Sequence, residues 1–236
     1  MKNMPKISSL IDKAVFDYEL IKNGDKILIG ASGGKDSTAL IEYFGMRLKR
    51  PDCGFKVKAL NIQSDFAPPF PAEIRKYIEN SGVLFESINV DVLKRVKENQ
   101  KMSCWWCSTQ RRTELLNYAL ANGFNKIALG HHLDDILETF LMNMTEKGNI
   151  STMVPKMKYN KWPVEIIRPL CYISESRLVE HAKKCGYYGF TCTCNFQDNS
   201  TRKSAREKLE FLTSGDEKIK QRMFNALKNV QLEYLP

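Results

Sequence analysis

Lys26-Ile27-Leu28-Ile29-Gly30-Ala31-Ser32-Gly33-Gly34-Lys35-Asp36-Ser37 is the stretch that decides the fold of this chain. It begins with a short apolar run typical of a buried strand, and a helical pattern follows from Thr38. The two adjacent glycines allow a tight turn, and the start of a helix offers unpaired N–H donors and a partial positive charge. Lys35 adds a full positive charge, and the two serines add hydroxyls. Together these features predict a loop that binds phosphate.

Two other interpretations of residues 32–37, here called the phosphate loop, can be compared with it. An ordinary Gly-Gly turn between a strand and a helix rarely needs a lysine and two serines. A Walker-type loop needs a glycine where Ile29 lies and a hydroxyl where Asp36 lies, so it fails at both ends. The stretch instead resembles the pyrophosphate loop of the ATP pyrophosphatase superfamily (PP-loop). That resemblance implies a loop that holds the β and γ phosphates of ATP and leaves the α-phosphorus open to attack.

Size and composition predict one globular domain with a small appendage. The chain has 236 residues, of which 43% are hydrophobic and 27% are charged, and no apolar run is long enough to span a bilayer. Its first six residues lack the apolar stretch of a secretory signal, and seven cysteines, an odd number, suit a reducing compartment. We therefore expect a cytoplasmic protein with no membrane partner. The net charge of +9 is compatible with a polyanionic partner.

Alternating apolar segments predict an α/β fold with a doubly wound parallel sheet of the HUP-like kind. Strands are expected over 26–31, 56–62, 84–90 and 126–130, with a possible edge strand over 164–168. Helices are expected over 6–21, 38–49, 71–80, 108–122, 133–144, 175–185, 202–213 and 216–229. We assign 1–169 to the ATP-binding core and 170–236 to a helical C-terminal extension. In such sheets the ligand lies beyond the carboxyl ends of the strands, where both the phosphate loop and residues 130–135 fall.

Two cysteine clusters are candidates for metal binding. Cys104-Trp105-Trp106-Cys107 precedes a predicted helix, and Cys192-Thr193-Cys194 lies far downstream. A redox dithiol would leave the second cluster unexplained, and a structural zinc site could use all four cysteines although Cys-x-Cys is a tight spacing. An iron–sulfur cluster could use three cysteines and keep one iron open. The spacing leaves zinc and iron–sulfur both open, whereas Cys185, in a predicted helix, is expected to pack.

Several blocks of the sequence resemble the tRNA 2-thiocytidine biosynthesis (TtcA) family. They are the segments 104–112, 126–139, 167–170 and 223–230, and with gaps the similarity runs from Asp17 to Val230. It implies a [4Fe–4S] cluster on Cys104, Cys107 and a third cysteine, with the fourth iron free to hold sulfur. Cys194 fits the family pattern better than Cys192 as the third ligand.

The resemblance also implies an ATP site and a set of catalytic residues. The catalytic set is Lys35, Asp36, Asp135, Cys104 and Cys107. The ATP-binding set is Ala31, Ser32, Gly33, Gly34, Lys35, Asp36, Ser37, Asn61, Ile62, Arg112, Gly130 and Asp135. ATP, Mg²⁺ and the [4Fe–4S] cluster are the implied cofactors.

The segment Gly130-His131-His132-Leu133-Asp134-Asp135 ends the fourth predicted strand and opens the clearest helix. Glycine at its start would let the backbone approach a nucleotide closely. His131 and Asp135 are four residues apart and share a face once the helix begins, so Asp135 could hold Mg²⁺ or orient the base. For Asp134, a favourable charge in the first helical turn is explanation enough. The two histidines are expected to cap or pack.

Basic residues suggest where anions bind. Arg111 and Arg112 fall in the first turn of the predicted helix over 108–122, where the dipole disfavours cations, so an anionic partner is expected beside them. A solvated helix end is the alternative. The segment Arg202-Lys203-Ser204-Ala205-Arg206 is the best candidate for a surface that faces tRNA.

The predicted function is an ATP-dependent tRNA sulfurtransferase that forms 2-thiocytidine. In the implied mechanism the C2 oxygen of a cytidine attacks the α-phosphorus of ATP, pyrophosphate leaves, and sulfur then displaces AMP. The implied partners are tRNA, a sulfur donor (a cysteine desulfurase or free sulfide) and a second copy of the chain. The alternatives are a tRNA uridine thiolase, a lysidine synthetase-like ligase, and a zinc-stabilised RNA-binding module with a vestigial nucleotide site. The prediction requires the phosphate loop and the cysteine pair to face one cavity.

Overall fold

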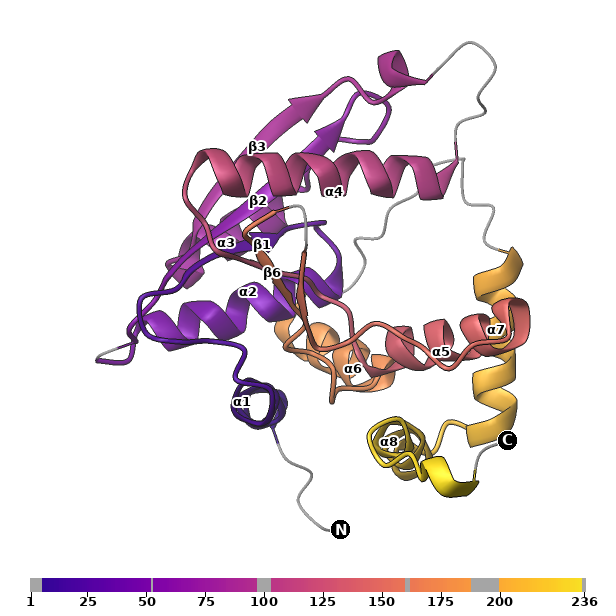
Figure 1. Cartoon of the computed structure of the whole chain (residues 1–236). Coiled ribbons are helices and arrows are strands. Elements are labelled where there is room, and N and C mark those ends of the chain that lie inside the picture. Colours follow the sequence, from indigo (N-terminus) through magenta and orange to yellow (C-terminus); the bar gives the residue numbers. More distant parts are fainter. Residues whose placement is uncertain (1–5, 52, 97–102, 160–161, 188–199, 235–236) are drawn as a thin grey trace.

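The structure is a computed structural model (Figure 1) and describes residues 6–51, 53–96, 103–159, 162–187 and 200–234. One six-stranded sheet forms its centre, in the order β3-β2-β1-β4-β6-β5. Its strands are β1 (Lys26–Gly30), β2 (Lys56–Ser64), β3 (Leu84–Val90), β4 (Lys126–Ala128), β5 (Lys156–Lys158) and β6 (Glu165–Ile167). All neighbouring pairs are parallel except β5 with β6. The predicted doubly wound parallel fold is confirmed.

One strand differs from the sequence prediction. The segment expected as an edge strand is β6, and it lies inside the sheet between β4 and β5. The edge is β5, which the sequence did not indicate because it has only three residues and none of them is fully buried. A strand that short carries too little alternation of apolar and polar residues to be recognised.

Helices cover both faces of the sheet (Figure 1). Helix α4 (Cys104–Ala121) packs on one face, where Leu115, Leu116 and Ala119 meet Leu28 and Leu60. The other face carries α1 (Ile7–Asp17), α2 (Lys35–Leu48), α3 (Ala72–Ser81), α5 (Leu133–Lys147) and α6 (Glu175–Cys185). The strand order reverses direction between β1 and β4, which is the position where doubly wound sheets bind ligands.

Helix α4 begins four residues earlier than the sequence pattern indicated. Ser103 is its N-cap, and the Ser103 side chain accepts a hydrogen bond from the Trp106 N–H at 3.2 Å. The cysteine pair therefore lies in the first helical turn and not in a preceding loop. Apolar periodicity is weak there, which is why only the cap could have revealed the true start.

The C-terminal helices share the core of the domain. Leu170, Cys171 and Ile173 are fully buried in it, and α6 packs against α2. Helices α7 (Ser200–Thr213) and α8 (Glu217–Ala226) pack against α5, and two 3₁₀ turns, Leu93–Arg95 and Leu232–Tyr234, complete the described elements. The division at residue 170 stays a prediction. Across the described ranges, every helix is too short or too polar to traverse a bilayer.

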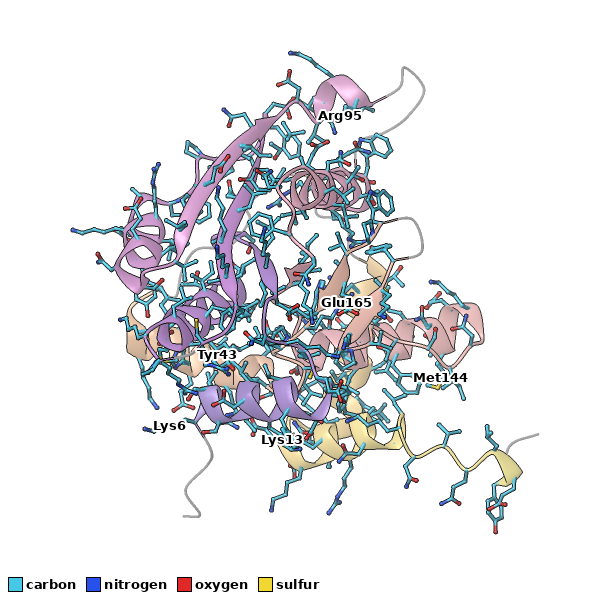
Figure 2. The ribbon with its side chains drawn as sticks, turned by 60° about the vertical axis from the view of Figure 1, so that its left-hand side comes forward. Lys6, Lys13, Tyr43, Arg95, Met144 and Glu165 are labelled. Carbon is cyan, nitrogen blue, oxygen red and sulfur yellow. The ribbon has the colours of Figure 1, made fainter. Side chains whose placement is uncertain are left out.

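Lys126 forms a buried set of polar contacts at the amino-terminal end of β4, and its substitution tests how much these contacts stabilise the fold. Its side chain is 3% exposed, and Nζ lies 2.8 Å from the Leu20 carbonyl, 3.0 Å from Asp25 and 3.3 Å from Glu165, which Figure 2 labels. We expect Lys126→Met to lower the free energy of unfolding by about 3–5 kcal/mol, because it leaves a buried carboxylate unpaired.

The control is Lys158→Met, since the Lys158 side chain is 80% exposed. We expect it to change the stability by less than about 0.5 kcal/mol. Urea denaturation of the two variants measures the difference. Equal stability of the two would mean that the buried contacts of Lys126 contribute nothing.

Candidate functional site

The phosphate loop is closed by its own serines and requires glycine at its turn. The Ser32 N–H donates to Ser37 Oγ at 3.2 Å, and the two hydroxyl oxygens are 3.0 Å apart. Gly33 has a φ of +81°, and a Cβ there would lie 3.2 Å from Pro71 and 3.3 Å from Phe70. Both the backbone conformation and the lack of space therefore exclude a side chain.

Lys35, the first residue of α2, is held by two carboxylates. Its Nζ lies 3.1 Å from Glu175 Oε1 and 3.3 Å from Asp36, and its side chain is 15% exposed. Burial alone would lower the pKa of Lys35, but Asp36 and Glu175 outweigh it and the pKa is raised. The lysine is therefore a permanent cation beside the loop. The sequence did not indicate Glu175, which lies 140 residues away from Lys35.

One carboxylate oxygen of Asp36 is buried and accepts no hydrogen bond from the described residues. Its Oδ1 lies 3.3 Å from Lys35 Nζ, yet within the described part of the chain it accepts no well-directed hydrogen bond. Burial raises the pKa of Asp36, against the opposing influence of His132 and Lys35. A buried carboxylate oxygen without a donor is a suitable ligand for Mg²⁺, so this residue fits the metal that the sequence implied.

The phosphate loop, α4 and the exit of β4 enclose one cavity of about 340 Å³. Its floor is apolar, from Leu60, Ile62, Leu115 and Leu129. Its polar lining is Ser32, Asp36, Ser37, Ser108, Arg111, Arg112, His131 and Asp135, with backbone from Gly30, Ala31 and Gly130. An apolar floor with convergent polar groups is typical of a small-molecule site, and its place between β1 and β4 is where the fold predicts one.

A smaller cavity of about 140 Å³ lies on the other side of the loop, and Ser32, Ile62 and Arg111 border both spaces. Gly33, Gly34 and Asn61 line only this second space. Asn61 uses both ends of its amide within the protein, because Nδ2 donates to the Ala31 carbonyl at 2.8 Å and Oδ1 accepts from Ser87 at 2.9 Å. The geometry makes Asn61 a support for the end of β1.

Gly130 lies close to the phosphate loop as well as in the lining of the cavity, and its close approach to a nucleotide stays a prediction. A Cβ there would lie 3.0 Å from the Ser37 nitrogen and 3.1 Å from the Asp36 carbonyl carbon. The close neighbour is therefore the phosphate loop itself, and glycine allows the end of β4 to pack directly against it.

Of the four polar residues between Gly130 and Ile136, two line the cavity and two point into the protein interior. His132 and Asp134 point inward. His132 is the N-cap of α5, in a reciprocal capping box with Asp135, and Asp134 accepts hydrogen bonds from buried Lys220 at 2.6 Å and from the Glu175 N–H at 2.7 Å. Asp134 therefore holds α6 and α8 to α5, in agreement with the structural role that its helix position suggested.

His131 and Asp135 line the cavity together, as their spacing predicted. Arg168 Nε donates to His131 Nδ1 at 3.2 Å, so a neutral ring carries its proton on Nε2. Burial lowers the pKa of His131 to about 4, with Asp135 opposing and Arg168 adding to the shift. Burial would raise the pKa of Asp135, but His132, His131 and Arg202 outweigh it and the pKa is lowered. The pair is thus a neutral donor beside a carboxylate.

Arg111 and Arg112 line the cavity, and no carboxylate of the described residues pairs with them. Because α4 begins at Cys104, they lie in its second and third turns, so the dipole argument made from the sequence does not apply. An anionic ligand beside them is supported by a different observation, namely their lack of ion pairs among the described residues. Neither arginine forms an ion pair with any residue that the structure describes, and both line the cavity.

The cysteine pair lies at the start of the same helix. Cys107 is a half-buried thiol, and the next residue, Ser108, lines the cavity. Cys104 is the first residue of α4, three residues before Cys107. Trp106 packs against the core beneath α4. Cys192 and Cys194 lie outside the described residues.

Two arginines of the basic segment 202–206 form ion pairs with carboxylates of α5 and α6. Arg206 Nε lies 2.9 Å from Glu138 Oε1 and its Nη2 lies 3.6 Å from Glu175, while Arg202 lies 3.5 Å from both Asp135 and Glu138. Glu138 is almost completely buried. Two of the three cations of this segment therefore hold α7 against α5 and α6, although the Arg202 side chain is 42% exposed and that of Arg206 is 57% exposed. That this segment faces tRNA stays a prediction.

Comparison with known proteins agrees with this geometry. The family described as a PP-loop domain matches residues 4–211. The chain belongs to this PP-loop family.

Within that family, the chain groups with the tRNA-cytidine(32) 2-sulfurtransferases. The enzyme so named from Francisella tularensis subsp. novicida is 35% identical over 223 residues, which are 92% of this chain and 83% of the relative. The one from Alkalilimnicola ehrlichii is 34% identical over 98% of this chain and 74% of the relative.

A solved structure shows the same fold. The U34-tRNA thiolase NcsA from Methanococcus maripaludis, solved with its [4Fe-4S] cluster, has a TM-score of 0.78 and 21% identity, and the match covers 98% of this chain and 80% of that one.

Asp134 and Asp135 provide a matched pair of variants. We expect Asp134→Asn to lower the free energy of unfolding by about 3 kcal/mol, since Lys220 stays buried and loses its charged partner. We expect Asp135→Asn to reduce ATP-dependent turnover about 10–100-fold with a smaller loss of stability. Thermal unfolding and steady-state kinetics measure the two effects. If Asp135→Asn turns over at the normal rate, the Asp135 carboxylate has no role in the reaction.

His131 predicts a pH dependence of stability. Between about pH 6.5 and pH 4 the unfolded chain binds a proton at this residue and the folded chain does not, so stability falls as the pH falls through that window. In His131→Gln this loss should be smaller, by on the order of 2 kcal/mol. Urea denaturation across the window gives both slopes. If stability depends on pH equally in the wild type and in His131→Gln, the folded protein does not keep His131 neutral.

Proposed function

We propose that this protein is an ATP-dependent tRNA sulfurtransferase that replaces the C2 oxygen of a cytidine with sulfur. The observation that carries the proposal is the cavity lined by the phosphate loop, by Ser108 just after the cysteine pair, and by two arginines with no carboxylate partner among the described residues. Membership of the sulfurtransferase family supports the choice of substrate.

In the proposed reaction, the loop and its cations bind the triphosphate of ATP. Backbone N–H groups at the start of α2 face the β and γ phosphates, and Lys35 exchanges its carboxylate contacts for phosphate oxygens. Asp36 and Asp135 would hold Mg²⁺ on the triphosphate. Arg111 and Arg112 neutralise the remaining charge, from ATP or from the tRNA backbone.

Adenylation follows when the cytidine C2 oxygen attacks the α-phosphorus. The bond to the β-phosphate oxygen breaks, and pyrophosphate leaves with its negative charge. The neutral His131 ring offers an Nε2–H to an oxygen of the α-phosphate, where charge develops in the transition state. The apolar floor around Leu60 and Leu115 excludes water from the adenylated base.

The second half of the reaction places sulfur where AMP departs. Two thiols three residues apart in a first helical turn, beside the positive end of the helix dipole, are a suitable donor set for an anionic iron–sulfur centre. When bound by Cys104, Cys107 and a third cysteine, Cys194 or Cys192, a [4Fe–4S] cluster would supply the sulfur that replaces AMP at C2. The protein's own part is to hold the base between the loop and α4.

The partners are tRNA, a sulfur donor in the cytoplasm (a cysteine desulfurase or free sulfide) and a second copy of the chain. Large apolar side chains at the C-terminal end are compatible with a homodimer, since Phe211 is 88% exposed and Leu232 is 78% exposed.

The substrate is tested in cells. Mass spectrometry of tRNA nucleosides from cells that lack this gene should show loss of 2-thiocytidine with other thiolated nucleosides unchanged, and the gene on a plasmid should restore it. Loss of a 2-thiouridine instead would identify a uridine thiolase. An unchanged nucleoside profile would refute thiolation.

The arginines are tested in vitro. We expect Arg112→Gln to raise the KM for ATP, or for tRNA, about 10–100-fold, because it removes a charge-assisted contact with phosphate. The matched control is Arg75→Gln, in which an exposed arginine of α3, away from the ATP cavity, loses its pairing with Glu79 and its contact with the Phe85 ring. Identical KM values for the two variants would exclude Arg112 from substrate binding.

A further inference from the structure

A second cavity, of about 460 Å³, lies between α1, α2 and α6. Its lining shares no residue with the ATP cavity. Lys6 and Tyr43, both labelled in Figure 2, belong to its walls, and so do Glu42 of α2 and His181 of α6. Nothing in the proposed sulfurtransferase reaction uses this space.

Three different metal-binding side chains converge at the wall of this cavity. His181 and Cys185 are four residues apart, one turn along α6, and Glu42 faces them from α2. Cys185 Sγ is 3.7 Å from His181 Nε2, and the same nitrogen is 2.8 Å from Glu42 Oε2. The three ligand atoms all lie within 4.8 Å of one another.

The geometry is not that of a Cys-His-Glu nucleophile. In such a triad the two ring nitrogens contact the thiol and the carboxylate separately. Here one nitrogen, Nε2, faces both groups. Burial and the neighbouring Glu42 also raise the pKa of Cys185, which is the reverse of what an activated nucleophile needs. A plain Glu42–His181 ion pair would explain the short contact but not the thiol beside it.

We propose that Glu42, His181 and Cys185 bind a zinc ion whose fourth position opens to the cavity. Zinc accepts nitrogen, sulfur and oxygen ligands together, and sites with three protein ligands keep one position for water. With Zn–S near 2.3 Å and Zn–N near 2.0 Å, a tetrahedral site separates sulfur and nitrogen by about 3.5 Å, close to the distance in the structure. The Glu42–His181 contact would widen to about 3.4 Å.

Two tyrosines complete the surroundings of the site. The Tyr187 hydroxyl donates to Glu42 Oε2 at 3.2 Å, and the Tyr77 ring lies against the Tyr187 ring with 5.1 Å between the ring centroids. Hydrogen bonds of this kind orient the ligands of metal sites. Cys185, which the sequence led us to expect as a packing residue, is half-buried, with its sulfur turned toward the other two ligands.

The site would join the two helices that position the phosphate-loop lysine. Helix α2 begins with Lys35 and α6 begins with Glu175, and these residues are in contact. Glu42 and His181 lie roughly two turns further along the same helices. Zinc there would fix α6 against α2. The zinc site does not depend on the proposed tRNA chemistry.

Cysteine alkylation of the full-length protein tests the proposal. The purified chain is treated with iodoacetamide with and without zinc chloride, and mass spectrometry follows each cysteine-containing peptide separately. We expect zinc to slow alkylation of Cys185 about tenfold or more, and to leave unchanged that of Cys53, a half-buried thiol outside the cluster.

Two variants show whether the other ligands take part. In Glu42→Gln and in His181→Gln, zinc at the same concentration should give little protection of Cys185, because loss of one ligand lowers the affinity for zinc about 10–100-fold or more. The comparison of the wild-type protein with and without zinc does not depend on the folding of either variant. Equal alkylation of Cys185 with and without zinc would overturn the proposal, as would full protection retained in both variants.

Discussion

Close backbone contact at the carboxyl edge of the sheet is the constraint on which the rest of this structure depends. Gly130, just after β4, lies so near the backbone of Asp36 and Ser37 that a Cβ there would be 3.0–3.1 Å from it, and Gly33 turns the loop against Pro71 and Phe70. A Cβ would be crowded at both positions. Because these segments meet so closely, residues from β1, from the loop after β4 and from α4 border the same cavity.

Charge is distributed unevenly around that cavity. On the side of α5 and α6, carboxylates and cations neutralise one another, since Glu175 contacts Lys35 and Arg206 while buried Glu138 contacts Arg202 and Arg206. On the side of α4, the two arginines have no carboxylate partner within the described residues. Burial and this surplus positive charge keep Arg168 near a pKa of about 10 and His131 neutral. The cavity is therefore arranged in advance for an anionic ligand.

The local features of the site could be predicted from the sequence, but most of its long-range partners could not. The phosphate loop and the shared face of His131 and Asp135 follow from short motifs and helical spacing, and both are present. The inward role of His132 as an N-cap also agrees with expectation. Glu175 could not have been foreseen as the partner of Lys35, because only the packing of α6 on α2 brings them together. For the same reason the ion pairs of Arg202 and Arg206 with α5 could not be predicted from the sequence. Cys185 packs against the core as expected, but the sequence did not indicate that Glu42 and His181 lie beside it. The early start of α4 was signalled by Ser103 alone.

The account rests on one cavity serving two successive steps on one base, adenylation at the loop and sulfur insertion beside α4. Single-turnover reaction of the Cys104→Ser/Cys107→Ser double variant with tRNA and ATP labelled in the α-phosphate tests this most directly. The account predicts that pyrophosphate is released and that labelled AMP accumulates on tRNA at cytidine, with no 2-thiocytidine formed. Thiolation at the wild-type level, or labelled AMP released without ever being attached to tRNA, would contradict it.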